Sequence, residues 1–170
     1  MENRRNQHGK RGRRGKKEQR EFDHALLNIA RVARVVQGGR RFSFRATVAI
    51  GNRKGKVGVG IAKGADVSSA IGKAVHNAKK NLVTFSIVNE TIPHETKTKF
   101  GSAQIIIKPA KLGKGIVAGG ALRAIAELGG IKNLTAKSLG SNNKINTARA
   151  MLKALSQLKI KKDDHANPSN

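Results

Sequence analysis

The chain has 170 residues and a formal net charge of +25. It contains no Cys, which excludes disulfides and thiolate metal sites, and no apolar run approaches the roughly 20 residues that a membrane span needs. A chain this cationic attracts polyanions, so a nucleic acid is the expected partner. With five Phe, no Tyr and no Trp, stacking of bases on aromatic rings is a poor main binding mode. Contacts to phosphates and recognition of the shape of the nucleic acid should dominate instead.

The first residues form a basic extension. Residues 1–20 hold nine Lys/Arg against Glu2 and Glu18 and show no hydrophobic period. We expect a disordered extension over 1–21 when no RNA is bound. It lacks the apolar segment of a secretory signal.

A hairpin is predicted over 38–64. Residues 25–37 begin as a helical or extended lead-in and become a strand, which Gly38-Gly39 ends. Apolar residues at every second position from Phe42 to Ile50 then predict a strand with one buried face and one cationic face. After a turn at 51–55, Gly58 and Gly60 leave one side of the next strand bare, where an anion could approach the backbone.

A helix completes the first domain. Asp66 is a suitable N-cap, and apolar residues recur at helical spacing from Val67 to Leu82. The first unit is therefore a β-β-β-α domain over 22–85.

The second unit alternates strands and helices. After a connection over 86–102, with room for one short strand, we expect a strand over 104–108 and a Gly/Lys loop. A helix over 117–128, a strand over 134–139 and a last helix then follow. The domains are thus 22–85 and 103–160, each with a small core, and 161–170 is expected to be a disordered tail. The fold class is α+β with two domains.

Enzymatic motifs are absent. The five His residues are scattered without ligand spacing, so no metal site is predicted, and no Gly-Lys pair is followed by Ser or Thr as a phosphate loop requires. Gly113-Lys114-Gly115 before the predicted helix is either a phosphate cradle or a tight packing loop, and Arg123 is either a solvated charge or an anchor into a partner. No catalytic residue, cofactor or small-molecule substrate is expected.

Several separated motifs are similar to one family. Their order and spacing closely resemble those of the bacterial small-subunit ribosomal protein five family, over about Phe22 to Leu158. The motifs that carry this resemblance are Gly38-Gly39-Arg40-x-Phe42-Ser43-Phe44, Gly55-Lys56-Val57-Gly58-x-Gly60, the run from Gly115 to Ala124, and Lys137-Ser138-Leu139-Gly140-Ser141-x-Asn143-x-Ile145-Asn146.

The resemblance implies a fold and partners. The first domain would have a double-stranded-RNA-binding-like fold, a three-stranded antiparallel sheet plus a helix, and the second a left-handed β-α-β fold. The protein would sit in the cytoplasmic ribosome and bind 16S rRNA at the head–body junction of the small subunit. It would touch ribosomal proteins four and eight, lie near mRNA where it enters the subunit, and affect decoding accuracy. The loop matching 31–40 would approach the spectinomycin-binding RNA helix.

The residues predicted to serve these roles fall into two groups. Gly115 and Arg123 match positions at the interface with protein four. The predicted RNA-binding residues are Arg31, Arg34, Gly38, Gly39, Arg40, Arg41, Arg45, Arg53, Lys54, Lys56, Gly58, Gly60 and Lys63.

The sequence departs from the family pattern in three places. The basic segment 1–20 is longer and more cationic than usual, Lys144 replaces a common proline, and the turn at 51–55 lacks the usual acidic residue.

Two alternatives stay open, a nucleoid-type nucleic-acid chaperone and a small-molecule kinase. The first predicts low-complexity basic sequence throughout, and the second lacks a phosphate loop.

Overall fold

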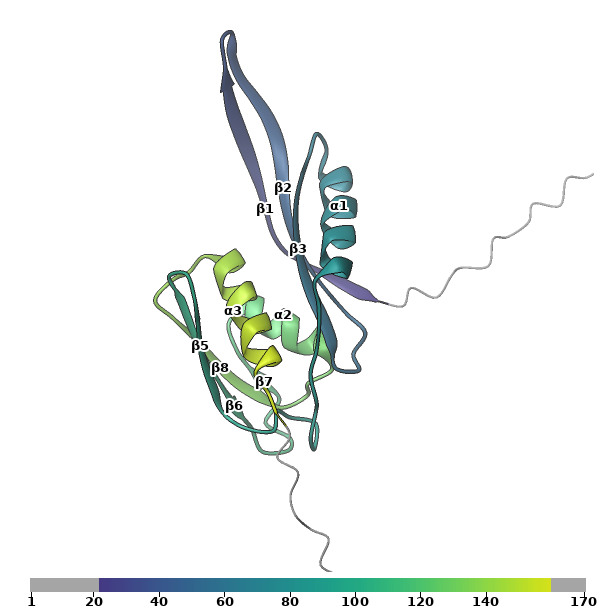
Figure 1. Ribbon diagram of the computed structural model, residues 1–170, viewed down its shortest axis with the longest axis vertical. Coiled ribbons are helices and arrows are strands. Elements are labelled where there is room, and N and C mark those ends of the chain that lie inside the picture. Colours follow the sequence, from purple (N-terminus) through teal and green to yellow (C-terminus); the bar gives the residue numbers. More distant parts are fainter. Residues whose placement is uncertain (1–21, 160–170) are drawn as a thin grey trace, which may run out of the picture.

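The computed structural model describes residues 22–159, which form two α+β units in contact (Figure 1). The predicted basic extension over 1–21 and the tail over 161–170 lie outside the described residues. The first unit consists of β1 (Asp23–Val36), β2 (Gly39–Gly51), β3 (Lys56–Gly64), α1 (Val67–Lys80) and β4 (Leu82–Thr84). The second consists of β5 (Thr96–Phe100), β6 (Ala103–Pro109), β7 (Ile116–Val117), α2 (Gly120–Gly129), β8 (Leu134–Leu139) and α3 (Lys144–Ser156).

The first sheet has four antiparallel strands in the order β1-β2-β3-β4, not the three predicted. The added strand, β4, follows α1 and pairs with Lys56–Gly58 of β3. The lead-in to the hairpin is extended from Asp23 onward, with an irregularity in the β1–β2 register between Leu26 and Asn28. Leu27 lies there and is buried.

Helix α1 covers one face of this sheet through alanines. Its buried residues, Ala70, Ala74 and Ala78, recur at a spacing of four and pack on Ala46, Val48 and Ile50 of β2. Such short side chains bring the helix backbone close to the strands. Asp66 is the N-cap residue, as predicted, but its side chain makes no capping hydrogen bond.

The second sheet has the order β5-β6-β8-β7, and helices α2 and α3 supply much of its core. Strand β7 pairs in parallel with β8, and α2 connects them, which gives the expected β-α-β unit. Two boundaries differ from the prediction. Strand β5 belongs to this sheet although it lies in the predicted connection, and α2 begins at Gly120 because Ile116–Val117 extend as β7.

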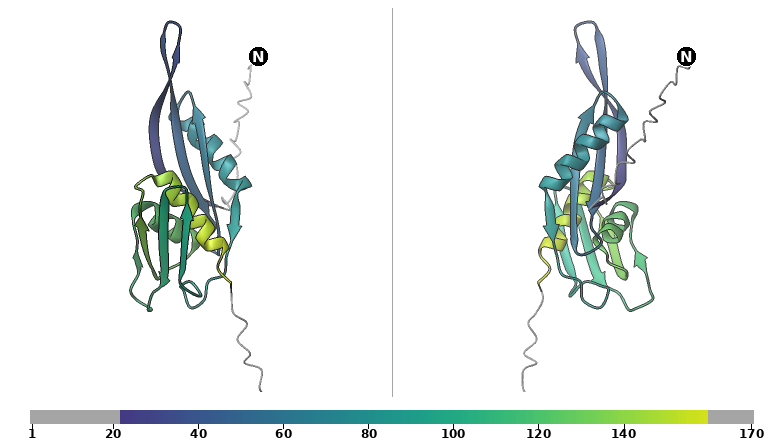
Figure 2. Two further views of the ribbon diagram at one scale, coloured as in Figure 1. Left: turned by 60° about the vertical axis from the view of Figure 1, so that its left-hand side comes forward. Right: turned by 90° about the vertical axis from the view of Figure 1, so that its right-hand side faces the viewer.

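The two units share a core on one face of the first sheet. A continuous cluster of buried residues joins Ala49, Val57 and Val59 of the first sheet to Ile125 and Leu128 of α2. Helix α1 therefore lies on one face of the first sheet and the second unit on the other (Figure 2). The first unit thus has a small core of its own under α1 and shares a second, larger core with the other unit. The prediction of a cationic face along all of β2 is wrong, because its last residues, from Ala46 to Gly51, are buried on both faces.

Candidate nucleic-acid interface

Strands β1 and β2 extend beyond the rest of the sheet as a two-stranded ribbon. Pairing between β2 and β3 stops at Phe44, whereas β1 and β2 remain paired up to Val36 and Gly39. At about 3.3 Å per residue, the ribbon projects about 20 Å past β3. Its tip protrudes at the top of Figure 1, away from the rest of the first unit and from the second unit. We call residues 31–44 the ribbon.

The ribbon concentrates positive charge. Arg34 lies directly opposite Arg41 across the two strands, and Arg40 is opposite Val35. All three arginines are exposed, and no acidic residue lies between 31 and 44. Like charges directly opposite each other destabilise a strand pair, and an anion beside Arg34 and Arg41 would relieve this repulsion.

The face of the ribbon opposite to Arg34 and Arg41 carries exposed apolar side chains together with Arg31 and Arg40. Val35 is 78% exposed and Phe42 is 47% exposed, and the guanidinium of Arg31 lies 3.7 Å from the centre of the Phe42 ring. Phe42 was predicted to be buried, but α1 does not reach this far along β2. A lone two-stranded ribbon with exposed apolar side chains is marginally stable in water, so a partner is expected to order it.

The tip of the ribbon is open. Gly38 and Gly39 are exposed, and a Cβ added at either would meet no atom within 4 Å. Gly39 has φ +143, a conformation that other residues rarely adopt. Both glycines are therefore accessible to a partner, as their predicted role requires.

Arg45 and Lys63 continue the cationic face at the base of the ribbon. They are register partners on β2 and β3, and Arg45 lies on the same face as Arg41. Arg45 is half-buried, and its Nε has no hydrogen-bond partner in the described structure.

Arg53, Lys54 and Lys56 lie at the opposite end of β2. Since a strand rises about 3.3 Å per residue, they are about 40 Å from the ribbon tip. The structure therefore splits the predicted RNA-binding set into two groups. They cannot form a single local site.

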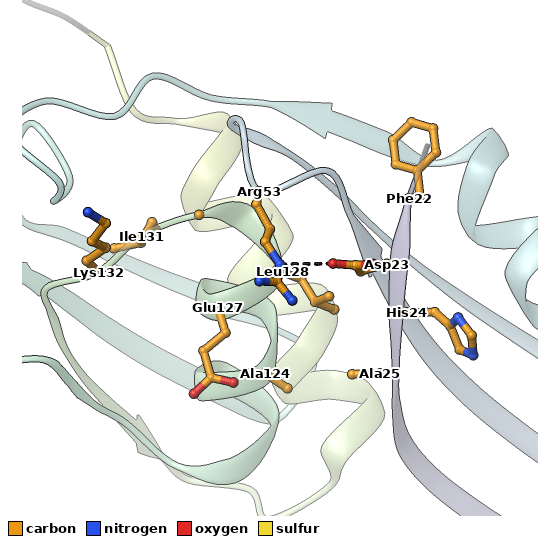
Figure 3. Close-up of a pocket in the computed structure, with 11 residues that line it drawn as sticks. Phe22, Asp23, His24, Ala25, Arg53, Ala124, Glu127, Leu128, Ile131 and Lys132 are labelled. Atoms are coloured by element: carbon orange, nitrogen blue, oxygen red, sulfur yellow. Dashed lines mark ion pairs between the residues drawn. The ribbon is translucent and has the colours of Figure 1, made fainter. Parts of the chain in front are cut away.

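The turn that carries Arg53 is hydrogen-bonded to the second unit. The Arg53 backbone N–H donates to the Leu128 carbonyl at 2.9 Å, and that of Gly55 donates to the Gly129 carbonyl at 2.9 Å. The Arg53 guanidinium pairs with Asp23 at 2.9 Å, across a cleft that also contains Glu127 and Lys132 (Figure 3). The turn backbone thus holds the two units together, while the side chains of Lys54 and Lys56 stay exposed.

Gly58 and Gly60 do not lie on the open face that was expected from the sequence. Both are buried under α1, and a Cβ on Gly60 would lie 2.0 Å from the Ala74 carbonyl oxygen. The bulky neighbour that requires a bare backbone is the chain's own helix. The spacing of glycines on a strand does not show whether the bulky neighbour is a helix of the same chain or a bound anion.

Gly115 and Arg123 both lie in the second unit. Gly115 has φ +72, and its N–H donates to the Asn133 side chain at 3.0 Å. Arg123 is exposed on α2 and pairs with Glu127 at 2.9 Å. Buried Asn133 fixes this loop, and nothing in its sequence context indicated that role.

The phosphate-cradle interpretation of the loop at 113–115 is wrong. The loop precedes β7, and α2 begins only at Gly120. The N–H of Gly115 is already bonded to Asn133, and that of Lys114 to the Lys111 carbonyl. The loop therefore does not present the free N–H groups of a helix start to an anion.

Acidic residues of the described part are almost all neutralised internally. Asp23, Glu90, Glu95 and Glu127 each pair with one cation, and Asp66 begins α1. Most Lys and Arg side chains of residues 22–159 therefore face solvent without a carboxylate.

Within this range, no group of three His, Asp or Glu side chains could hold a metal ion. None of its helices is long and apolar enough to cross a membrane.

Comparisons with known proteins agree with this architecture. The family model "Ribosomal protein S5, N-terminal domain" matches residues 22–86, and "Ribosomal protein S5, C-terminal domain" matches residues 98–167. The chain is 50% identical over 139 residues to the small ribosomal subunit protein uS5 of Campylobacter jejuni strains 81-176 and RM1221, which covers 82% of this chain and 95% of those proteins. With both family domains matched in order, the chain belongs to the ribosomal protein S5 family.

Proposed function

We propose that this chain is a non-catalytic structural constituent of the small ribosomal subunit that binds 16S rRNA mainly through the ribbon. The observation that carries the proposal is the register of Arg34 against Arg41 on an exposed ribbon with no acidic residue. That arrangement is costly in the free protein and favourable beside phosphates. Membership of the S5 family supports the choice of rRNA as the polyanion.

The ribbon would enter between RNA helices. Arg34, Arg40 and Arg41 would neutralise phosphates, while Gly38 and Gly39 let the tip lie against an RNA backbone. Arg45 and Lys63 would extend the contact toward the body of the protein. Lys54 and Lys56 would form a second, smaller contact at the far end of the sheet.

The finer assignments rest on the family resemblance. They are docking at the head–body junction, contact with ribosomal proteins four and eight, proximity to mRNA where it enters the subunit, and an effect on decoding accuracy. Arg123 is exposed on α2 and outside the ribbon, so it is accessible to a protein neighbour as the proposed contact with protein four requires. Its pair with Glu127 holds the guanidinium on the helix surface.

The salt dependence of rRNA binding tests the ribbon. We expect Arg34→Ala/Arg41→Ala to weaken binding of 16S rRNA and to lower the slope of log affinity against log salt by about two. The matched control is Lys97→Ala/Lys99→Ala on β5, which removes the same charge from exposed positions. Equal slopes for the two variants would overturn the assignment.

Competition separates ribosomal from general nucleic-acid binding. Filter binding of the full chain to 16S rRNA should survive an excess of random duplex DNA. A nucleoid-type chaperone would instead bind both with equal affinity.

A further inference from the structure

A groove on a different side of the molecule joins the two units. It has a volume of about 710 Å³ and lies between α1 and α3. It is lined by Val59, Gly60, Ile61, Asn77, Lys80, Asn81, Val83, Phe100, Arg149, Leu152, Lys153 and Ser156. None of these residues belongs to the ribbon.

The groove runs along an open strand edge. Strand β4 pairs with β3 only at Lys56–Gly58, so no strand lies beside Val59–Gly64 on that side. One carbonyl there, that of Ile61, accepts a hydrogen bond from the Asn77 side chain at 3.1 Å. Exposed strand edges are the sites where extended peptides add to a sheet.

Apolar side chains provide much of the lining. Ile61, Val83 and Leu152 are each partly exposed, and they come from β3, β4 and α3. The second unit thus supplies one wall and the first unit the other. A partner seated here would remove apolar surface from water, which favours binding in proportion to the area covered.

The rim of the groove is cationic. Lys80, Arg149 and Lys153 are exposed, none of them takes part in an ion pair within residues 22–159, and no carboxylate lines the groove. Two of these side chains are held in place. The Arg149 guanidinium lies 5.6 Å from the centre of the Phe100 ring, and the Lys153 ammonium donates to the Lys99 carbonyl at 3.3 Å.

We propose that this groove binds an extended acidic segment of a partner protein, with apolar side chains on the floor and carboxylates at the rim. RNA fits less well, because a phosphate backbone gains nothing from covering Val83 and Leu152. Phe100, the one aromatic ring in the groove, already faces Arg149. The site is separate from the ribbon, so the protein would hold RNA and a protein neighbour at once.

Defined peptides test the groove in the full chain. The probes are a fluorescein-labelled peptide of alternating Glu and Leu, one of alternating Glu and Ser with the same charge, and a uridine octanucleotide. Binding is followed by fluorescence anisotropy at physiological salt, and its location by amide chemical shifts. The variant is Lys153→Glu, and the matched control is Lys137→Glu, an exposed lysine of β8 outside the groove.

We expect the Glu-Leu peptide to bind about tenfold more tightly than the Glu-Ser peptide. Lys153→Glu should weaken Glu-Leu binding about tenfold and Lys137→Glu less than about twofold. The amides of Val59 and Ile61 should shift. Equal affinity for the two peptides, equal loss in the two variants, or shifts of the same amides by the uridine octanucleotide would each overturn the proposal. None of these results bears on rRNA binding by the ribbon.

Discussion

Replacing Gly60 with alanine tests why β3 lacks side chains under α1. The added Cβ would lie 2.0 Å from the Ala74 carbonyl oxygen, 2.4 Å from the Ala78 nitrogen and 2.9 Å from the Ala78 Cα. All three atoms belong to the helix backbone, so no rotamer change can relieve the overlap. Helix α1 must move as a body.

The size of that movement sets the expected loss of stability. Real Cβ atoms are essentially never closer than 3.0 Å to such neighbours, so the helix has to shift by at least about 1 Å from the strand. The shift loosens the contacts of Ala70, Ala74 and Ala78 with β2. We expect the free energy of unfolding to fall by about 3 kcal/mol, at the upper end for an overpacked core.

Urea unfolding followed by circular dichroism measures the effect in the absence of RNA. The control is Gly38→Ala at the ribbon tip, where a Cβ meets nothing within 4 Å and stability should change by less than about 0.5 kcal/mol. If Gly60 were bare in order to admit an RNA backbone, the free protein would tolerate alanine at both positions. Equal stability of the two variants would therefore refute the packing argument.

Three further substitutions have defined outcomes. Thr47→Val should leave stability unchanged or raise it by up to about 1 kcal/mol, because the fully buried Thr47 hydroxyl has no hydrogen-bond partner; a clear loss in urea unfolding would mean that it has one. Gly130→Ala should open the contact between the units, because Gly130 has φ +90 and its Cβ would lie 2.1 Å from the Arg53 carbonyl oxygen. Faster hydrogen exchange at the Arg53 and Gly55 amides would report that opening, and unchanged protection would contradict it. Arg123→Ala should change stop-codon readthrough more than subunit assembly, and a readthrough reporter that does not respond would contradict the proposed contact with protein four.

Much of the fold could be predicted because local patterns determine it. Helix α1 begins after Asp66 as its capping residue and apolar spacing indicate, and the hairpin follows from alternation in β2 and the turn before Lys56. Strand β4 was missed because three residues are too few to show a period. Strand β7 was missed for the same reason, which also placed the start of α2 too early.

The site was harder to predict because it depends on contacts between distant segments. Alternation identified the two faces of β2, but only the tertiary structure decides where each face is covered. Phe42 is exposed because α1 ends short of it, and Ala49 is buried because α2 covers it. Gly38 and Gly60 look alike in the sequence, yet one is open and the other lies under a helix.

Incorporation into ribosomes tests the central claim most directly. Epitope-tagged full-length chain and its Arg34→Glu/Arg41→Glu and Lys97→Glu/Lys99→Glu variants are expressed in cells and fractionated on sucrose gradients. We predict that the wild type and the Lys97/Lys99 variant sediment with the small subunit, whereas the ribbon variant is depleted from that peak. Wild-type protein that stays at the top of the gradient, or a ribbon variant that enters the subunit as well as the control, would contradict the account.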